Sequence, residues 1–246
     1  SQQAPGLSRY LPGPPFPRPG NPIPVPSTLS SLTPVLSPLL SAIFCADMDQ
    51  GQGLPAVRIG EIVEASTARF VAQCYRLYDA PPLGALVRAG SPQTYAIVSS
   101  VTTQALDPGR PVVPRGEAEE TEEDILRNNP QLSRLLCTRF EAVVVGHMEG
   151  EALRHYPPPL PPRIHAFVYC CGPQEVTRFT HSTDFIHTLL ASGLPNVDDV
   201  LAACLRQAGR CHSSNGDFLV RAGKALAVEL AGQLPRLNAI LRRLSG

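Results

Sequence analysis

Between residues 55 and 105, short apolar runs alternate with turn signals, a pattern that predicts strands rather than helices. The connecting segments carry Pro, Gly, Asp and Ser, which favour tight turns. Several short strands at this spacing are typical of a small antiparallel barrel, and we expect a closed β-barrel here. The expected strands lie at residues 59–64, 70–75, 83–87 and 95–101.

The strand pattern returns after an insertion, so we place the barrel over residues 55–180. The runs 138–146 and 164–170 are apolar and of strand length. Between the two groups, the insertion at 116–136 begins with six carboxylates within residues 117–124. Carboxylates are favourable at the N-terminus of a helix because they interact well with its dipole. We therefore expect an acidic, helical insertion.

After residue 180 the apolar positions recur with a helical period, which predicts a helical domain over residues 181–246. Gly193 and Gly209 are placed to end two of the helices, and Pro235 is placed to begin the last one. About four helices fit this stretch, either as a bundle or as a layer on the barrel. They are expected near residues 183–192, 196–209, 217–230 and 235–244.

Residues 1–54 are interpreted as a separate, proline-rich arm. Eleven prolines fall between Pro5 and Pro38, and each proline fixes φ and removes a backbone donor. An extended, polyproline-like arm is therefore expected. A linker without fixed structure and a tether that orders on a partner both fit this composition. The predicted fold class is thus α+β, with an extended arm, a small closed β-barrel and a C-terminal bundle of about four helices.

The bulk composition narrows the class of protein. The 246-residue chain has 21 basic and 21 acidic residues, so no overall charge attracts it to nucleic acid or anionic lipid. Only 17% of residues are charged, which indicates a surface partly covered by partners. The best apolar run of the arm, residues 35–46, is too short to span a bilayer. We expect protein partners and no transmembrane segment, while peripheral association with a membrane-bound complex stays open.

Seven cysteines are scattered along the chain, and several lie in apolar runs. Reduced cysteines behave as small buried hydrophobes, whereas disulfide scaffolds are shorter and richer in cysteine. A reducing, cytoplasmic location is therefore expected. Cys204, Cys211 and His212 are close in sequence, but structural zinc usually draws on cysteines about two to four residues apart. We expect core thiols here and no metal site.

Nucleotide hydrolysis has no support in the sequence. A phosphate-binding loop ends in Gly-Lys followed by Ser or Thr. The only Gly-Lys pair, Gly223-Lys224, is followed by Ala225. The expectation is a non-enzymatic protein without catalytic residues or cofactors.

Six segments, in this order and spacing, carry a family resemblance: Ile59-Gly60-Glu61-Ile62-Val63, Gln73-Cys74-Tyr75-Arg76-Leu77, Leu83-Gly84-Ala85-Leu86-Val87, Asn129-Pro130-Gln131-Leu132-Ser133-Arg134-Leu135, Ala142-Val143-Val144-Val145-Gly146 and Pro161-Pro162-Arg163. Over roughly residues 57–171 the chain resembles the HAS-barrel, the small barrel shared by HerA-type translocases and the catalytic-ring subunits of rotary ATP synthases. It also looks like stand-alone cyanobacterial members that carry C-terminal helices and no motor domain. The resemblance implies a barrel that packs side by side in a collar and binds no nucleotide.

We therefore expect a non-enzymatic assembly, scaffold or adaptor subunit that binds protein partners through the arm and the C-terminal helices. A regulatory or collar partner of a HerA-type or rotary motor ATPase is the alternative. A third possibility, single-stranded nucleic-acid binding, needs exposed aromatic and basic side chains, for which the candidates are Tyr75, Arg76, Tyr78, Arg88 and Tyr95. No nucleic acid is expected, because the charges balance. The expected partner-binding residues are Phe16, Leu36, Leu39, Phe44, Leu237 and Leu241.

Overall fold

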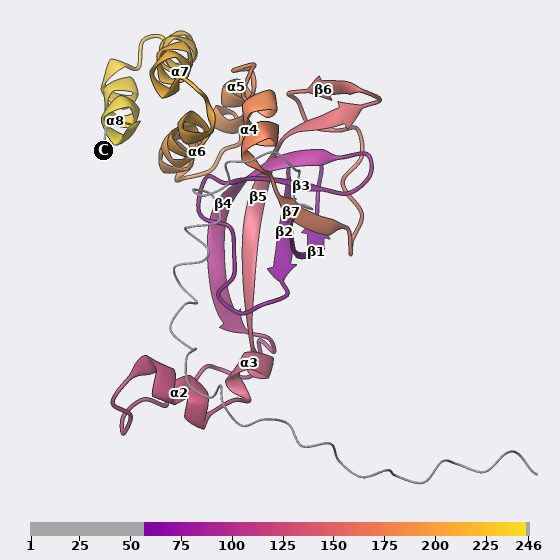
Figure 1. The fold of residues 1–246 in the computed structure, drawn as a ribbon, viewed down its shortest axis with the longest axis vertical. Helices are drawn as coiled ribbons and strands as arrows, with labels where there is room; N and C mark the ends of the chain where they lie inside the picture. Colours follow the sequence, from indigo (N-terminus) through magenta and orange to yellow (C-terminus); the bar gives the residue numbers. More distant parts are fainter. Residues whose placement is uncertain (1–56, 245–246) are drawn as a thin grey trace, which may run out of the picture. The chain divides into compact units, whose positions relative to one another are not determined.

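The computed structural model describes residues 57–244, which form one antiparallel sheet and a set of helices (Figure 1). This architecture confirms the predicted α+β class. The strands are β1 (Arg58–Ala65), β2 (Arg69–Cys74), β3 (Leu86–Ala89), β4 (Thr94–Ala105), β5 (Leu136–Glu149), β6 (Ala152–Arg154) and β7 (Phe167–Cys170). The helices are α2 (Glu122–Asn128), α3 (Leu132–Leu135), α4 (Pro173–Phe179), α5 (Phe185–Leu190), α6 (Val197–Cys211), α7 (Asn215–Glu229) and α8 (Leu234–Leu244).

The strands pair in the order β2-β1-β7-β3-β4-β5-β6, and β2 also pairs with β5. Six strands therefore form a ring of antiparallel pairs, while β6 pairs with β5 alone. In the pair that joins the two ends of the sheet, Phe70 on β2 faces Ala142 on β5. Gly60 lies where β1 meets both of its neighbours, and a Cβ there would be 2.1 Å from the Gln73 carbonyl oxygen. This close approach of β1 and β2 requires glycine.

Alternate side chains of the ring strands gather in one buried cluster, here called the inner cluster. On β5 its members are Phe140, Ala142 and Val144. Each of the six ring strands contributes to it, and Ile62 on β1 and Phe70 on β2 are almost completely buried there. Successive side chains of a strand point to opposite faces. The residues between these members therefore face away from the inner cluster.

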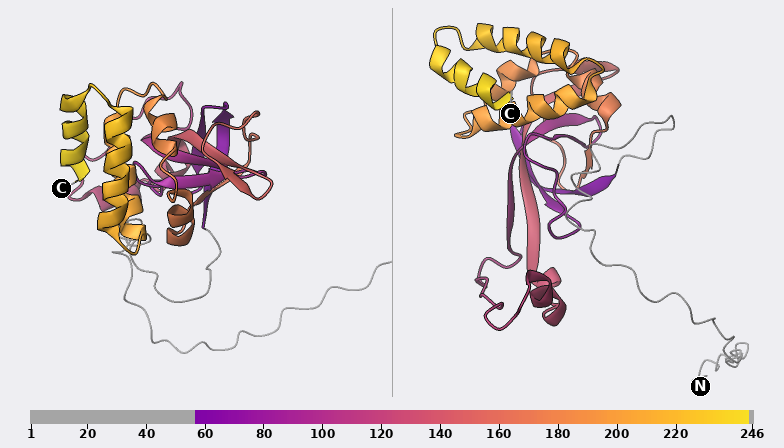
Figure 2. Two further views of the ribbon diagram at one scale, coloured as in Figure 1. Left: turned by 90° about the horizontal axis from the view of Figure 1, so that it is seen from above. Right: turned by 60° about the vertical axis from the view of Figure 1, so that its left-hand side comes forward.

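The outward face of β3, β4 and β5 packs against the C-terminal helices (Figure 2). Tyr95 and Ile97 on β4, with Val143 and Val145 on β5, join side chains of α4 to α8 in a second cluster, here called the helix–sheet cluster. β3, residues 94–99 of β4 and residues 142–147 of β5 are thus buried on both faces, which explains their continuous apolar sequence. The outer face of β1 and β2 is only partly buried, and their sequences alternate accordingly.

Five helices, rather than about four, follow β7. The additional helix is α4, so the helices begin at Pro173 within the segment that was assigned to the barrel. Proline is favourable in the first turn, where no amide donor is needed. The helix buries only Val176 and Phe179. Two apolar positions do not establish a helical period, which is why the sequence pattern did not reveal α4.

A partly buried polar contact ties α4 to the sheet. Arg88 Nε on β3 lies 3.0 Å from Glu175 Oε1, and the Tyr95 hydroxyl on β4 donates to the same carboxylate at 3.0 Å. Burial and the neighbouring Glu175 raise the pKa of Tyr95, so the phenol stays protonated and acts as a donor. The sheet and the helices were expected as two domains, but this contact and the helix–sheet cluster make them share a core.

Gly84 links the sheet to α6. Its φ is +81°, and its amide donates to the Val98 carbonyl at 2.8 Å. A Cβ on Gly84 would lie 2.5 Å from the backbone nitrogen of Cys204 on α6. The preceding Leu83 carbonyl accepts a hydrogen bond from the Gln207 side chain at 2.6 Å. Both the left-handed backbone and the close approach to α6 therefore require glycine.

Gly84→Ala is expected to lower the free energy of unfolding by about 3 kcal/mol, because backbone strain adds to overpacking against α6. Gly193→Ala is a matched control, since Gly193 also has a positive φ, +73°, but nothing lies within 4 Å of an added Cβ. The control should lose about 1 kcal/mol, from the backbone alone. Urea denaturation followed by circular dichroism measures both values. Equal losses would contradict the packing role assigned to Gly84.

Candidate protein-interaction site

Of the six residues expected to contact partners, two lie in the described part of the chain and four do not. Phe16, Leu36, Leu39 and Phe44 lie outside the described residues.

The remaining two expected contacts lie on α8 and differ in burial. Leu237 is 8% exposed and belongs to the helix–sheet cluster, so its side chain serves the core of the chain itself and is not available to a partner. Leu241 is half-buried against that cluster and also lines a shallow depression on α8. Of these two residues, only Leu241 is placed to touch another molecule.

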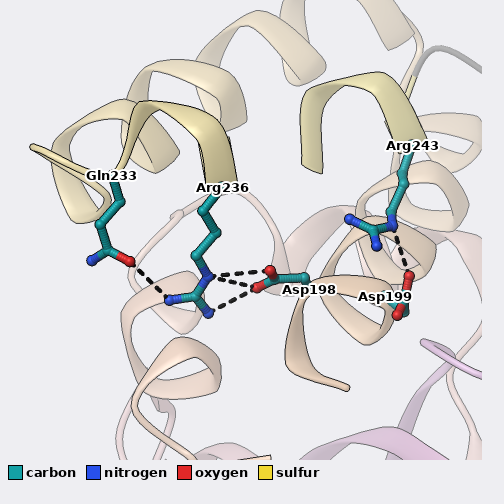
Figure 3. A network of polar contacts seen from close by, with 5 residues as sticks. All are labelled: Asp198, Asp199, Gln233, Arg236 and Arg243. Atoms are coloured by element: carbon teal, nitrogen blue, oxygen red, sulfur yellow. Dashed lines mark hydrogen bonds and ion pairs between the residues drawn. The ribbon is translucent and has the colours of Figure 1, made fainter. Parts of the chain in front are cut away.

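Two ion pairs hold α8 against the start of α6 (Figure 3). Arg236 binds Asp198 through Nε and Nη2 at 2.8–3.1 Å, and it also donates to Gln233. Arg243 Nε lies 2.7 Å from Asp199 Oδ1. The hydrogen bonds with Asp198 raise the pKa of the Arg236 guanidinium. Because a forked arginine–carboxylate pair constrains orientation, this network fixes how α8 sits on α6.

The helices leave a few large apolar side chains at the surface. Val220 and Val228 on α7 are 57% and 76% exposed, and Leu234 at the start of α8 is 66% exposed. Single exposed apolar residues are common on protein surfaces. Of these residues, Leu234 lines the same depression as Leu241, whereas Val228 lines a different one.

The acidic insertion expected at residues 116–136 contains α2 and α3, whereas the long strands that carry it were not predicted from the sequence. β4 and β5 continue as a long ribbon, in which residues 100–105 pair with residues 136–141 (Figure 1). β2 still pairs with β5 as far as Arg139, so only residues 103–105 and 136–138 extend beyond the ring as two strands. The ribbon leads to α2, α3 and their loops, here called the tip (residues 106–135). Along β4, side chains are buried up to Ser99 and largely exposed from Ser100 onward.

The tip combines apolar side chains with carboxylates. Thr121 caps α2 by accepting a hydrogen bond from the Asp124 amide, and its hydroxyl and Arg127 lower the pKa of the Asp124 carboxyl. Val112 and Val113 lie in a loop between Pro111 and Pro114, and both side chains are exposed. Exposed apolar side chains beside carboxylates suit contact with a protein surface. Each of the following ribbon and tip residues is 42–62% exposed: Val101, Leu106, Val112, Val113, Leu126 and Leu135.

Four of the thiols, those of Cys74, Cys137, Cys171 and Cys204, are buried like core residues. Burial raises the pKa of Cys74 and of Cys204 to about 12, so both thiols are protonated at neutral pH. A protonated thiol is neither a good nucleophile nor a metal ligand. His212 lies 2.8 Å from the Thr180 hydroxyl and stacks on Phe218, which also indicates a structural role. Within residues 57–244, His, Cys, Asp and Glu do not gather in threes that could hold a metal ion.

A second shallow depression is lined by two histidines that the fold already holds. His187 Nδ1 on α5 lies 2.8 Å from Glu229 Oε2 on α7. His155 Nε2 lies 2.9 Å from the Phe179 carbonyl oxygen at the end of α4. Both rings therefore connect neighbouring elements, and the exposed His187–Glu229 pair becomes an ion pair when the ring is protonated.

The candidate nucleic-acid residues do not form one surface. Tyr75 and Tyr78 are more than half exposed, whereas Tyr95 is 4% exposed in the helix–sheet cluster. Arg88 forms an ion pair with Glu175. Arg76 is exposed between Tyr75 and Tyr78 in the turn after β2. The five candidates thus divide into an exposed group at this turn and a second group, Arg88 and Tyr95, that contacts Glu175.

No family model matches the sequence, and a search of curated proteins finds no match. The resemblance to the HAS-barrel therefore stays a prediction. Between residues 57 and 244, none of the helices has the length and apolar character needed to cross a bilayer.

Leu237→Ala is expected to lower the free energy of unfolding by about 3 kcal/mol, because it leaves a cavity in the helix–sheet cluster. Leu241→Ala is the matched substitution on the same helix, and its half-buried position predicts a loss of about 1 kcal/mol or less. Thermal and urea denaturation of the two variants measure the difference. A larger loss for Leu241→Ala would show that the two residues have been assigned to the wrong environments.

Proposed function

We propose that this chain is a non-enzymatic assembly, scaffold or adaptor subunit of a larger protein complex. The observation that supports this best is the ribbon with its tip. A two-stranded hairpin is only marginally stable in water. Here such a hairpin extends past the inner cluster and carries exposed apolar residues at its end. Burial of that surface by a partner would be favourable by about 25 cal/mol per Å² before the costs of association.

The tip also indicates the chemistry of the partner surface. Residues 115–136 contain six carboxylates and three arginines, a net charge of −3. Protein interfaces commonly have an apolar centre and a polar rim. The partner surface that fits the tip is therefore an apolar patch with basic residues around it. The arm and the exposed face around Leu241 are proposed as additional contacts.

The ring is proposed to be a HAS-type barrel that serves as the scaffold. Support comes from the pairing of β2 with β5, which joins the ends of the sheet, and from the large side chains Phe70 and Phe140 in the inner cluster. The aromatic side chains of Phe70 and Phe140 fill the interior of the barrel, so the scaffold is suited to contact through its outer surface.

A collar partner of a motor ATPase is the second candidate. The outer side of β1 and β7 favours it, because no residue of these two strands joins the helix–sheet cluster. Phe167 is 42% exposed there, with the Arg58 guanidinium 4.2 Å from the centre of its ring. Barrels that pack side by side would use such a flank. A ring-sized oligomer with the motor subunit would support this candidate.

The paired substitution Val112→Asp with Val113→Asp is expected to weaken partner binding at least about tenfold, because it places charges in a surface that must lose water. The measurement is quantitative identification of the proteins cross-linked to the tagged full-length chain in its native cell. Val220→Asp with Val228→Asp on α7 is the matched control, since these valines are at least about as exposed, 57% and 76% against 59% and 62%. Circular dichroism should show that both variants fold.

If the tip variant retains every cross-linked protein at the wild-type level, the tip is not the contact. A loss confined to the α7 variant would assign binding to the helices instead. If the wild-type chain cross-links to no other protein, the adaptor function itself is wrong.

A further inference from the structure

The β4 side of the ribbon is an open strand edge. The pairing of β4 with β3 ends at Ile97, opposite Leu86. The next two positions are covered by Gly84, which donates to the Val98 carbonyl, and by the Asn196 side chain, which donates to the Ser99 carbonyl at 3.0 Å. Beyond them, no strand in the described part of the chain pairs with residues 100–105 on that side.

The opposite side of the ribbon is covered, which makes the open edge specific to β4. β2 pairs with β5 as far as Gln73 opposite Arg139. The turn after β2 then continues the cover, because the Tyr78 amide donates to the Thr138 hydroxyl at 2.8 Å. Thr138 is 1% exposed as a result. The fold therefore protects the β5 edge and leaves the β4 edge accessible.

Three residues direct their backbone groups out of the open edge. The Leu106 amide donates to the Leu135 carbonyl at 2.8 Å, so Leu106 faces β5. Alternate residues of an antiparallel strand bond to opposite neighbours. Counting back from Leu106, the N–H and C=O groups of Val101, Thr103 and Ala105 point away from β5.

This edge lacks the features that usually prevent pairing. Exposed edges are commonly blocked by charged residues, proline or a bulge. Residues 99–106 read Ser-Ser-Val-Thr-Thr-Gln-Ala-Leu and contain neither charge nor proline. The register shift in β4 lies between Val98 and Ser100, before the open part begins. Val and Thr also favour extended structure. The edge is therefore suited to accept another strand.

We propose that two copies of this chain dimerise by antiparallel pairing of their β4 edges. The two-fold axis passes beside Thr103, which pairs with Thr103 of the second copy. Val101 then pairs with Ala105 of the second copy, and each such pair exchanges two backbone hydrogen bonds. Thr102 and Gln104 of the second copy lie opposite each other with their side chains in contact.

A second copy fits this edge better than an unrelated strand for two reasons. The segment is uncharged, so pairing with itself creates no like-charge repulsion, and cross-strand threonine pairs are favourable. Antiparallel pairing also brings the tip of one copy toward the α6 end of β4 in the other. The tip region carries −3, whereas residues 197–244 contain seven basic and four acidic residues, a net of +3. This self-association is independent of the partner proposed for the tip.

The test uses the full-length chain of 26.4 kDa in sedimentation equilibrium, where the wild type should show twice that mass. Thr102→Glu with Gln104→Glu places like charges opposite each other across the axis, so dimerisation should weaken at least about tenfold. Thr102→Glu with Gln104→Lys is the matched variant, in which opposite charges face each other and the dimer should persist. Both positions are exposed, so neither change alters the core.

A monomeric wild type, a Glu/Glu variant that dimerises like the wild type, or a monomeric Glu/Lys variant would each overturn the proposal. Hydrogen exchange of the wild type gives a second readout that needs no variant. The amides of Val101, Thr103 and Ala105 should be protected in concentrated solution and lose protection on dilution. Protection that does not change with dilution would mean that a strand of the same chain covers the edge, which would also overturn the dimer.

Discussion

The fold depends on a wall of three strands, β3, β4 and β5, that is buried on both faces. Val143 and Val144 are neighbours on β5, yet one packs in the helix–sheet cluster and the other in the inner cluster. A slip of one residue in the β4–β5 register would exchange the two sets of side chains. The packing of both clusters therefore fixes this register, and the register in turn places the ribbon and the sites where the helices attach.

The helices are attached to this wall by a small number of specific contacts. Glu175 brings the start of α4 to Arg88 and Tyr95. Gly84 and Gln207 bring α6 against the turn before β3. Asp198 and Asp199 at the start of α6 in turn bind two arginines of α8. The last helix is thus positioned through α6, and the burial of Leu237 follows from that docking rather than from its own sequence neighbourhood.

The sequence was informative where the periodicity reflects burial. The apolar runs of β4 and β5 and the helical periods of α6, α7 and α8 matched elements of the structure because each buries a long face. Periodicity was less informative where burial is brief, as in α4, or where an element is defined by partners distant in sequence, as in the three-residue β6. Likewise, the spacing of Leu237 and Leu241 indicates an apolar helix face but does not say whether the chain itself covers that face.

The ribbon shows why the extent of a strand and its burial are separate questions. The first half of β4 is apolar because it lies between two clusters, while Ser100 to Gln104 remain extended through pairing with β5 alone. Where β4 leaves the wall, the Gly84 amide and the Asn196 side chain donate hydrogen bonds to the carbonyls of Val98 and Ser99. Within residues 57–244, no such donors reach the carbonyls of the positions that follow. A charged residue or a proline there would have prevented strand pairing without disturbing the core, because these side chains are exposed. The β4 edge is thus covered up to Ser99 and can pair from Ser100 onward, which suits it to accept another strand.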